Sequence, residues 1–285
     1  MADGWGVEDE TSPLRDVLVG PPENFEWLPT SAISKAALAG ERQLAPGDAV
    51  NAHGEMVSAY EDAGVTVHRL AADPALPYQV FSRDSSVWGS AGPIVTQLHQ
   101  SWRRGEYAPV IDFYEGAGIE LAHKITAGAI EGGDLVLPAA RTALIGHCEE
   151  RTEAPAARQL AGWLGELGWQ VRLQPFDPHF VHIDVIVNVV APGLAVICDE
   201  AAPPGLADWL GGLGLELLSV SYGDCMSLGA NAMSLGHDRV VSTAGAGVLN
   251  ERLRAMGLTV YDPDLWPFTM GGGGPHCLAQ PLRRD

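Results

Sequence analysis

Five polar residues stand at nearly regular intervals along the chain, and each opens an apolar stretch that is typical of a β-hairpin. These openers are Asp84, Asp134, Asp184, Asn231 and Cys277, and they succeed one another at steps of 50, 50, 47 and 46 residues. If the stretches are repeats of one unit, the openers occupy equivalent places and converge. Three acids, an amide and a thiol in one place are costly unless they bind a cation or satisfy one another. The spacing therefore favours a cation-binding site beside the thiol of Cys277.

Capping of the hairpins is the competing interpretation for the openers. Aspartate and asparagine side chains often hydrogen-bond nearby backbone where a chain turns. We prefer this structural role for Asn231, and for Asp134 the two interpretations stay open. Asp84 and Asp184 are taken as ligand-binding residues.

The segments after the hairpins also recur along the chain. After each hairpin, a segment with helical periodicity ends in glycine and leads into a short β-rich run. The helical segments are 106–118, 152–168, 203–214 and 245–257, and the β-rich runs are 119–123, 169–176, 215–221 and 258–262. The sequence therefore predicts an α/β protein built from repeated ββαβ units.

The fifth unit is divided between the two ends of the chain. Eight residues come after Cys277, and the front of the chain supplies a strand, a helix and a returning strand at 14–20, 48–64 and 65–71. We expect the two terminal segments to pair and close a ring of five units, in one catalytic domain spanning residues 1–285. Residues 21–45 are surplus to the unit, and we expect them to form a loop over the mouth of the ring.

The charge of the chain argues against several classes of partner. Its 17 Lys and Arg stand against 36 Asp and Glu, which gives a formal net charge of −19. Such a surface repels nucleic-acid phosphates and anionic membranes, and it attracts a small cation. The acidic start MADGWGVEDE lacks the features of a signal peptide, and no apolar stretch is long enough to span a bilayer, so we expect a cytoplasmic protein. Whether several copies assemble into a homo-oligomer is left open.

The four cysteines are well separated, and none belongs to a CxxC pair. Their spacing therefore predicts neither a zinc site nor a small disulfide framework. We expect no metal and no cofactor. Cys148, Cys198 and Cys225 are interpreted as small buried side chains.

Four motifs carry a resemblance to a known superfamily. They are FSRD at 81–84, EGGD at 131–134, HID at 182–184 and GGGGPHC at 271–277. Together and in this order they resemble the guanidino-modifying enzymes of the pentein fold, which include arginine deiminases, dimethylarginine dimethylaminohydrolases and amidinotransferases. The resemblance implies a fivefold ββαβ propeller, the same architecture that the repeats predict.

The chemistry of that superfamily suits these residue types. Guanidinium is a planar cation that carboxylates hold through paired acceptors, and Asp84 and Asp184 resemble those carboxylates. Attack on the guanidinium carbon needs a strong nucleophile, and cysteine is the side chain that is appreciably ionised near neutral pH. The resemblance implies that Cys277 forms a covalent thiouronium intermediate, which water hydrolyses to a ureido product such as citrulline.

A histidine and a glutamate are expected to complete the catalytic group. His182 suits the transfer of a proton to the leaving nitrogen and from the incoming water. It is two residues from Asp184, so on a strand both side chains would project to the same face. By resemblance Glu131 orients this histidine and contacts the guanidinium. His276 is interpreted as structural, because in an extended segment it would point away from its neighbour Cys277.

An arginine-like substrate also carries an α-carboxylate, which an acidic site can hold only with a dedicated cation. By resemblance Arg103 and Arg151 are the candidates, and the alternative for each is an ordinary surface arginine. The glycine run at 271–274 is interpreted as a turn that lets backbone approach a ligand closely.

The reaction class is better defined than the substrate. The acid in HID resembles deiminases and amidinotransferases, whereas the compact length resembles the dimethylaminohydrolases. Hydrolysis of an arginine-type guanidino group is our first choice, and amidino transfer to an amine is the alternative. A noncatalytic pentein that binds a macromolecule is the third hypothesis, which the negative charge opposes for RNA. With acids at both 84 and 184 we predict that an unmethylated guanidine is preferred over asymmetric dimethylarginine.

Overall fold

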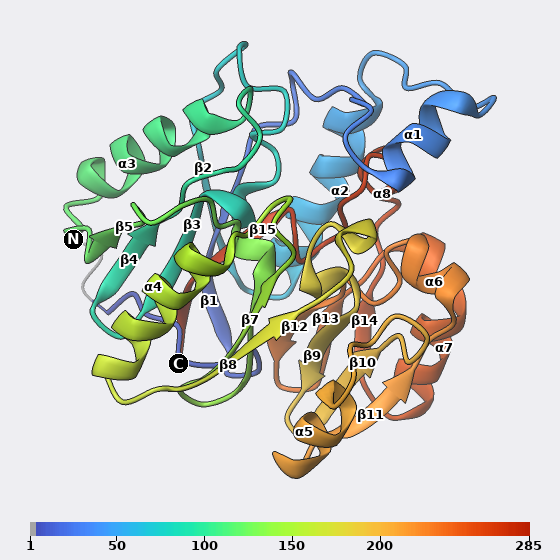
Figure 1. Ribbon diagram of the computed structural model, residues 1–285. Helices are drawn as coiled ribbons and strands as arrows, with labels where there is room; N and C mark the ends of the chain where they lie inside the picture. The colour runs from blue at the N-terminus through green and yellow to red at the C-terminus, as the bar shows by residue number, and fades with distance from the viewer. Residues whose placement is uncertain (1–3) are drawn as a thin grey trace.

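The computed structural model describes residues 4–285 and contains five three-stranded sheets (Figure 1). In four of them a hairpin, a helix and a third strand succeed one another in the chain. The hairpin strands are β3 (Ser86–Gly89), β4 (Gly92–Val95), β6 (Leu135–Ala139), β7 (Thr142–His147), β9 (Val187–Ala191), β10 (Leu194–Ile197), β12 (Met233–Gly236) and β13 (Arg239–Val241). The helices are α3 (Tyr107–Gly116), α4 (Ala154–Glu166), α5 (Leu206–Gly212) and α7 (Gly247–Ala255), and the third strands are β5 (His123–Lys124), β8 (Gln170–Pro175), β11 (Glu216–Ser219) and β14 (Thr259–Tyr261).

Every sheet combines the same two kinds of pairing. The hairpin strands are antiparallel, and the strand that returns after the helix adds in parallel to the second hairpin strand. A parallel pair needs a crossover connection, which the helix provides. The predicted ββαβ units are therefore confirmed.

The fifth sheet joins the two ends of the chain. β15 (Ala279–Arg284) pairs antiparallel with β1 (Leu14–Val19), with Leu18 opposite Gln280. β1 in turn pairs in parallel with β2 (Thr66–Arg69), which comes after α2 (Asp48–Asp62). The predicted pairing of the terminal segments is confirmed, and it explains why β1 and β15 lie together in Figure 1.

The packing within each unit reflects its apolar pattern. On α4 the buried residues Ala157, Leu160 and Leu164 recur every three or four positions, so one face of the helix packs against its sheet. All residues of β9 and β10 are buried, as expected for strands that are covered on both faces. The five openers are buried as well, and none is more than 4% exposed.

Three helices depart from the prediction. α1 (Ala32–Ala39) lies inside the segment predicted to be a loop. Its N-cap residue, Ser31, exchanges reciprocal capping hydrogen bonds with Ser34. α6 (Tyr222–Met226) and α8 (Trp266–Thr269) are short additions outside the repeated unit. No helix in the described part of the chain is both long and apolar enough to cross a membrane.

The openers are not the first residues of strands. A short 3₁₀ helix precedes each of three hairpins, either directly or with one residue between them. These helices are Ser82–Ser85, Gly132–Asp134 and Ile183–Val185. The prediction that His182 and Asp184 share one face of a strand is therefore wrong. A 3₁₀ turn winds the backbone sharply, and it lets two residues that are close in sequence contact different neighbours.

Candidate active site

Consecutive openers are joined by hydrogen bonds between their segments. The bonds run from Gly133 N to Asp84 Oδ1 (3.1 Å), from Ile183 N to Asp134 Oδ1 (2.8 Å), from Asn231 Nδ2 to Asp184 O (3.1 Å), from Cys277 N to Asn231 Oδ1 (3.2 Å), and from Arg83 N to Cys277 O (3.3 Å). The predicted convergence is therefore present. Asp134 and Asn231 bond backbone as the capping interpretation proposed, but the backbone belongs to the neighbouring unit.

Five of the seven predicted site residues line one cavity of about 30 Å³. These are Asp84, Arg103, Arg151, His182 and Cys277, and the wall is completed by Thr30, Ser31, Tyr78, Phe81, Val181 and Gly271–Gly273. The other two predicted residues, Glu131 and Asp184, are fully buried behind this wall.

His182 lies between two carboxylates. Its Nε2 is 2.8 Å from Glu131 Oε2, and its Nδ1 is 3.8 Å from Asp84 Oδ1. Burial by itself would lower the pKa of His182, but Asp84, the Cys277 side chain and Glu131 raise it well above the ordinary value. The imidazole is therefore protonated at neutral pH and can act as an acid.

Glu131 stays ionised despite its burial. Desolvation would raise its pKa, but Arg151, at 3.5 Å, and the hydrogen bond from His182 outweigh that effect and leave the pKa well below the usual range. The glutamate can therefore hold the charge and orientation of His182, as the resemblance implied.

The thiol of Cys277 is held in its protonated form. Burial, together with the negative charge of Asp184, raises the pKa of Cys277 to about 12, although contact with His182 opposes the rise. The expectation of appreciable ionisation near neutral pH therefore fails for the site by itself. Cys277 Sγ is 3.4 Å from Asp184 Oδ2, so a cation arriving here would offset the carboxylate and favour the thiolate.

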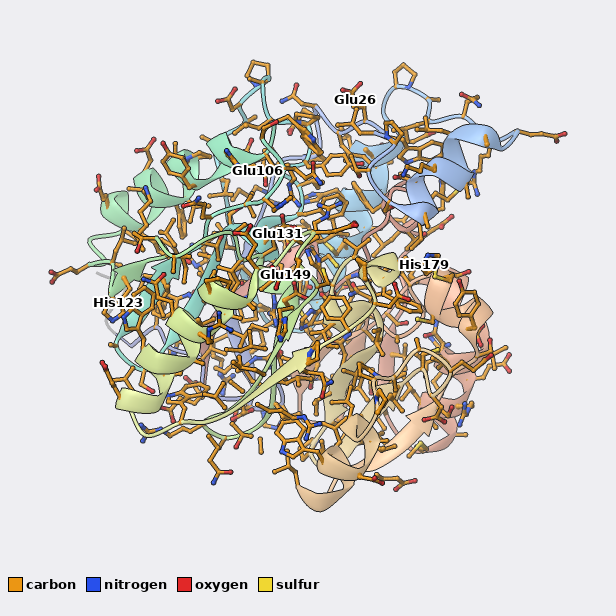
Figure 2. All side chains as sticks on the ribbon, viewed as in Figure 1. Glu26, Glu106, His123, Glu131, Glu149 and His179 are labelled. Atoms are coloured by element: carbon orange, nitrogen blue, oxygen red, sulfur yellow. The ribbon has the colours of Figure 1, made fainter. Side chains whose placement is uncertain are left out.

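Arg103 is a buried ion-pair partner, not a surface arginine. Its side chain is 2% exposed, and its Nη1 is 2.9 Å from Asp84 Oδ2. Nε and Nη2 each donate to the carboxylate of Glu106 at 2.8 Å. Figure 2 shows Glu106 and Glu131 toward the middle of the molecule, whereas His123 and His179 lie at its edges. Sequence reasoning missed Glu106, whose only signal is the spacing of three residues from Arg103 in RRGE.

Arg151 connects the site to the segment that covers it. It is also buried, with Nη1 directed at Glu131 and Nη2 donating to the backbone oxygen of Thr30 at 3.2 Å. Thr30 and Ser31 precede α1 and line the cavity. The predicted loop therefore reaches the site at Thr30 and Ser31, and it includes a helix that was not predicted.

Asp184 and His276 form a second carboxylate and imidazole pair behind Cys277. His276 Nδ1 is 2.8 Å from Asp184 Oδ2. Burial would raise the pKa of Asp184, but this hydrogen bond and the charges of its neighbours lower it. The orientation predicted for His276 is wrong because its segment is a turn rather than a strand.

Asp134 is fully buried and does not line the cavity. Burial raises the pKa of Asp134 to about 7, so this carboxyl group is less suited than Asp84 to hold a cation.

Ligating atoms of Asp84, Glu131 and His182 lie within 4.8 Å of one another, as a metal site would require. However, Arg103 Nη1 lies 2.9 Å from Asp84 and 3.6 Å from Glu131, which places a cationic side chain at this cluster.

The glycine run lies against the cavity wall. A Cβ on Gly273 would come within 2.3 Å of the Phe81 ring, and Gly272 has φ of +104°, a conformation that favours glycine. The close backbone approach expected of this turn is therefore present, with Phe81 as the neighbour.

The fold and these side chains match the superfamily that the motifs resembled. A family model described as eukaryotic N,N dimethylarginine dimethylhydrolase matches residues 22–284. Because this match covers nearly the whole chain, the chain belongs to that family of hydrolases, within the pentein superfamily of guanidino-modifying enzymes.

Individual relatives are more distant. The chain is 29% identical over 234 residues to the uncharacterized protein YkgA of Bacillus subtilis, which covers 81% of this chain and 79% of that protein. It is 28% identical over 255 residues to an arginine deiminase of Rhodococcus erythropolis, which covers 75% of this chain but 61% of that enzyme. The solved N-terminal domain of ArgZ, described as a cyanobacterial arginine dihydrolase, has a TM-score of 0.78 at 15% identity, over 94% of this chain and 98% of that one.

Proposed function

We propose that this protein hydrolyses the guanidino group of arginine or an arginine derivative through a covalent intermediate on Cys277. The observation that carries the proposal is the presence of Cys277, His182 and Asp84 around one cavity. Membership of a dimethylarginine dimethylhydrolase family and similarity to proteins named arginine deiminase and arginine dihydrolase support it.

Substrate binding exchanges one guanidinium for another. The Arg103 guanidinium now contacts Asp84 Oδ2, and both residues line the cavity. The guanidinium of the substrate takes the place of Arg103 at Asp84, while the covering segment with Thr30 moves outward. The released Nη1 of Arg103, together with Arg151, binds the α-carboxylate.

The first half of the reaction transfers the amidino group to sulfur. The positive charge of the substrate lowers the pKa of Cys277, and the thiol proton leaves to solvent. The sulfur electron pair then forms a bond to the guanidinium carbon, and the π pair moves onto nitrogen. His182 donates its proton to the departing nitrogen as the C–N bond breaks, which leaves a thiouronium group on Cys277 and releases an amine or ammonia.

The second half uses His182 in the opposite direction. Now neutral, it removes a proton from water, and the oxygen adds to the thiouronium carbon. The C–S bond breaks, its electron pair returns to sulfur, the hydroxyl proton of the adduct restores the Cys277 thiol, and the ureido product leaves. Amidino transfer to another amine is not proposed, since the family and the named relatives with a known activity are hydrolases.

The proposed architecture of the site is a closed ring. We infer that residues 1–285 form one catalytic domain whose five units surround the cavity. The hydrogen bond from Arg83 N to Cys277 O, which links the first opener segment to the fifth, supports this arrangement.

The preferred substrate is an unmethylated guanidine. Dimethylation of one terminal nitrogen deletes two N–H donors, so a buried carboxylate is left unpaired. Such a loss reduces binding by roughly tenfold to hundredfold. The test is kcat/KM for arginine, monomethylarginine and asymmetric dimethylarginine on wild type and on Asp184→Asn. We expect arginine to be preferred and the variant to narrow the gap; dimethylarginine as the best wild-type substrate would contradict this selectivity.

The reaction itself is tested with a panel of guanidino compounds. Mass spectrometry of the products distinguishes ammonia, methylamines and ureido compounds. Production of ornithine without a ureido compound in the presence of an amine acceptor would indicate amidino transfer, and no turnover of any compound would contradict the proposed function.

A further inference from the structure

Four buried side chains form a line that ends at the thiol. Asp184 Oδ2 is 3.4 Å from Cys277 Sγ and 2.8 Å from His276 Nδ1. On the other side of the imidazole, His276 Nε2 is 2.7 Å from Arg83 Nη2 and 3.6 Å from Glu10 Oε1. Arg83 Nη2 also donates to Glu10 at 2.9 Å. None of the four is more than 5% exposed.

The contact with Arg83 determines the tautomer of His276. An arginine side chain has only donors, so Nε2 at 2.7 Å from it must accept a hydrogen bond with its lone pair. The ring proton therefore lies on Nδ1 and is donated to Asp184 Oδ2. Glu10 compensates the charge of Arg83, which would otherwise be buried without a partner.

This donation leaves the two oxygens of Asp184 in different states. Oδ2 accepts from His276 and contacts the thiol, whereas Oδ1 is buried and has no hydrogen-bond partner among residues 4–285. A carboxylate oxygen without a partner is costly in the interior. An N–H donor of a guanidinium bound at Cys277 would satisfy it.

The charged groups of the line do not balance one another. The line holds two carboxylates, Glu10 and Asp184, and one guanidinium, that of Arg83. Asp184 is the carboxylate at the thiol end of the line, where His182 and a cationic substrate would both offset its charge. The line therefore provides a fixed acceptor at the point where the proposed reaction needs one.

We propose that His276 is a positioning residue, which holds Asp184 Oδ2 beside Cys277 so that Oδ1 faces the N–H donors of the guanidinium. This proposal rests on the proposed function for the identity of the cation. It assigns a role to a residue that does not itself contact the substrate.

Three substitutions separate positioning from simple packing. His276→Asn keeps an N–H close to the place of Nδ1, whereas His276→Gln carries its amide further along the side chain, toward Arg83. His276→Ala removes the donor entirely. We expect His276→Ala and His276→Gln to reduce kcat/KM by roughly tenfold to hundredfold. His276→Asn should retain kcat/KM within about fivefold of wild type. His53→Asn, at a buried histidine of α2 outside this line, is the matched control and should leave kcat/KM unchanged.

A second measurement reports the charge beside the thiol without requiring turnover. The rate of alkylation of Cys277 by a cationic haloacetamidine is divided by the rate with neutral iodoacetamide, at one pH and with folded protein. We expect His276→Gln and Asp184→Asn each to lower this ratio by roughly tenfold. The double variant should fall no further, because both changes disable the same carboxylate.

The results of these two measurements support or overturn the positioning role. The proposal is supported if kcat/KM is retained in His276→Asn but not in His276→Gln, and if the alkylation ratio is lowered in His276→Gln. Three results would overturn it: equal losses of kcat/KM in His276→Asn and His276→Gln, wild-type kinetics in His276→Ala, or an unchanged alkylation ratio in His276→Gln. If His276→Ala does not fold, the comparison of His276→Asn with His276→Gln decides between positioning and packing. Because the alkylation ratio needs no substrate, failure to find a guanidino substrate is distinguishable from failure of this proposal.

Discussion

Two buried histidines lie close to Cys277, and their surroundings give them different roles. His182 and His276 are both buried, and each bonds a carboxylate at 2.8 Å. The second neighbour differs: His182 Nδ1 is 3.8 Å from Asp84 Oδ1, whereas His276 Nε2 is 2.7 Å from the guanidinium of Arg83, with Glu10 Oε1 further away at 3.6 Å.

This difference shows that burial alone does not decide what a histidine does. Two carboxylates stabilise the imidazolium form of His182 and raise its pKa, which suits a residue that gives up a proton and takes one back. An arginine beside the other ring requires a lone pair there, so His276 serves as a fixed donor. Substitutions at the two histidines should therefore have different consequences.

The largest effect is expected where both histidine systems meet. Cys277→Ser should reduce kcat by roughly a thousandfold or more, because a serine hydroxyl ionises far less readily than a thiol. The measurement is steady-state turnover together with the thermal unfolding midpoint. Cys148→Ser, at a half-buried cysteine, is the control. Near-wild-type activity in Cys277→Ser would exclude the covalent route.

The contrast itself is tested by the same substitution at each histidine. His182→Gln should reduce kcat by roughly a hundredfold to ten-thousandfold, because neither the leaving nitrogen nor the water has a proton-transfer partner. Intact-protein mass spectrometry should show either the thiouronium adduct on Cys277 or no reaction. His276→Gln should cause a smaller loss and no accumulated adduct. Equal losses, or adduct in both, would remove the distinction.

The pKa of His182 can be shifted by removing one of its carboxylates. In Glu131→Gln the imidazolium loses a stabilising charge, so its pKa falls. His182 then loses its proton at a lower pH, so the alkaline limb of the kcat profile should shift to lower pH by roughly 1 unit. A pH profile of kcat from pH 6 to about pH 10 checks this shift. A limb that moves upward or stays in place would mean that another group sets it.

The smallest expected effect concerns the thiol by itself. Since the pKa of Cys277 is raised to about 12, its ionised fraction and its alkylation by neutral iodoacetamide should keep rising with pH through about pH 10 without a plateau. The Cys277 peptide is quantified by mass spectrometry, because four cysteines are present. A plateau below about pH 8 would show that the site already holds a thiolate.

The repeated units and most candidate residues could be predicted from the sequence because their signals are local. Hairpin, helix and strand patterns recur within each stretch of about fifty residues, and the same period marks Asp84, Asp184 and Cys277 as equivalent positions. The pairing of β1 with β15 could be predicted by elimination, since the fifth unit lacked its remaining parts at one end and had them at the other.

The contacts that assign roles depended on the tertiary structure. His276 and Asp184 are 92 residues apart, and Arg83 and His276 are 193 residues apart, so no local pattern records that they touch. The same holds for Arg103, whose position against Asp84 depends on how the loop before α3 packs onto the first opener. The amino-acid sequence by itself determined which side chains are available and at what period they occur, because periodicity is a local property. Only the folded chain decided which of them share a hydrogen bond and which carry a proton, because both depend on neighbours brought together by packing.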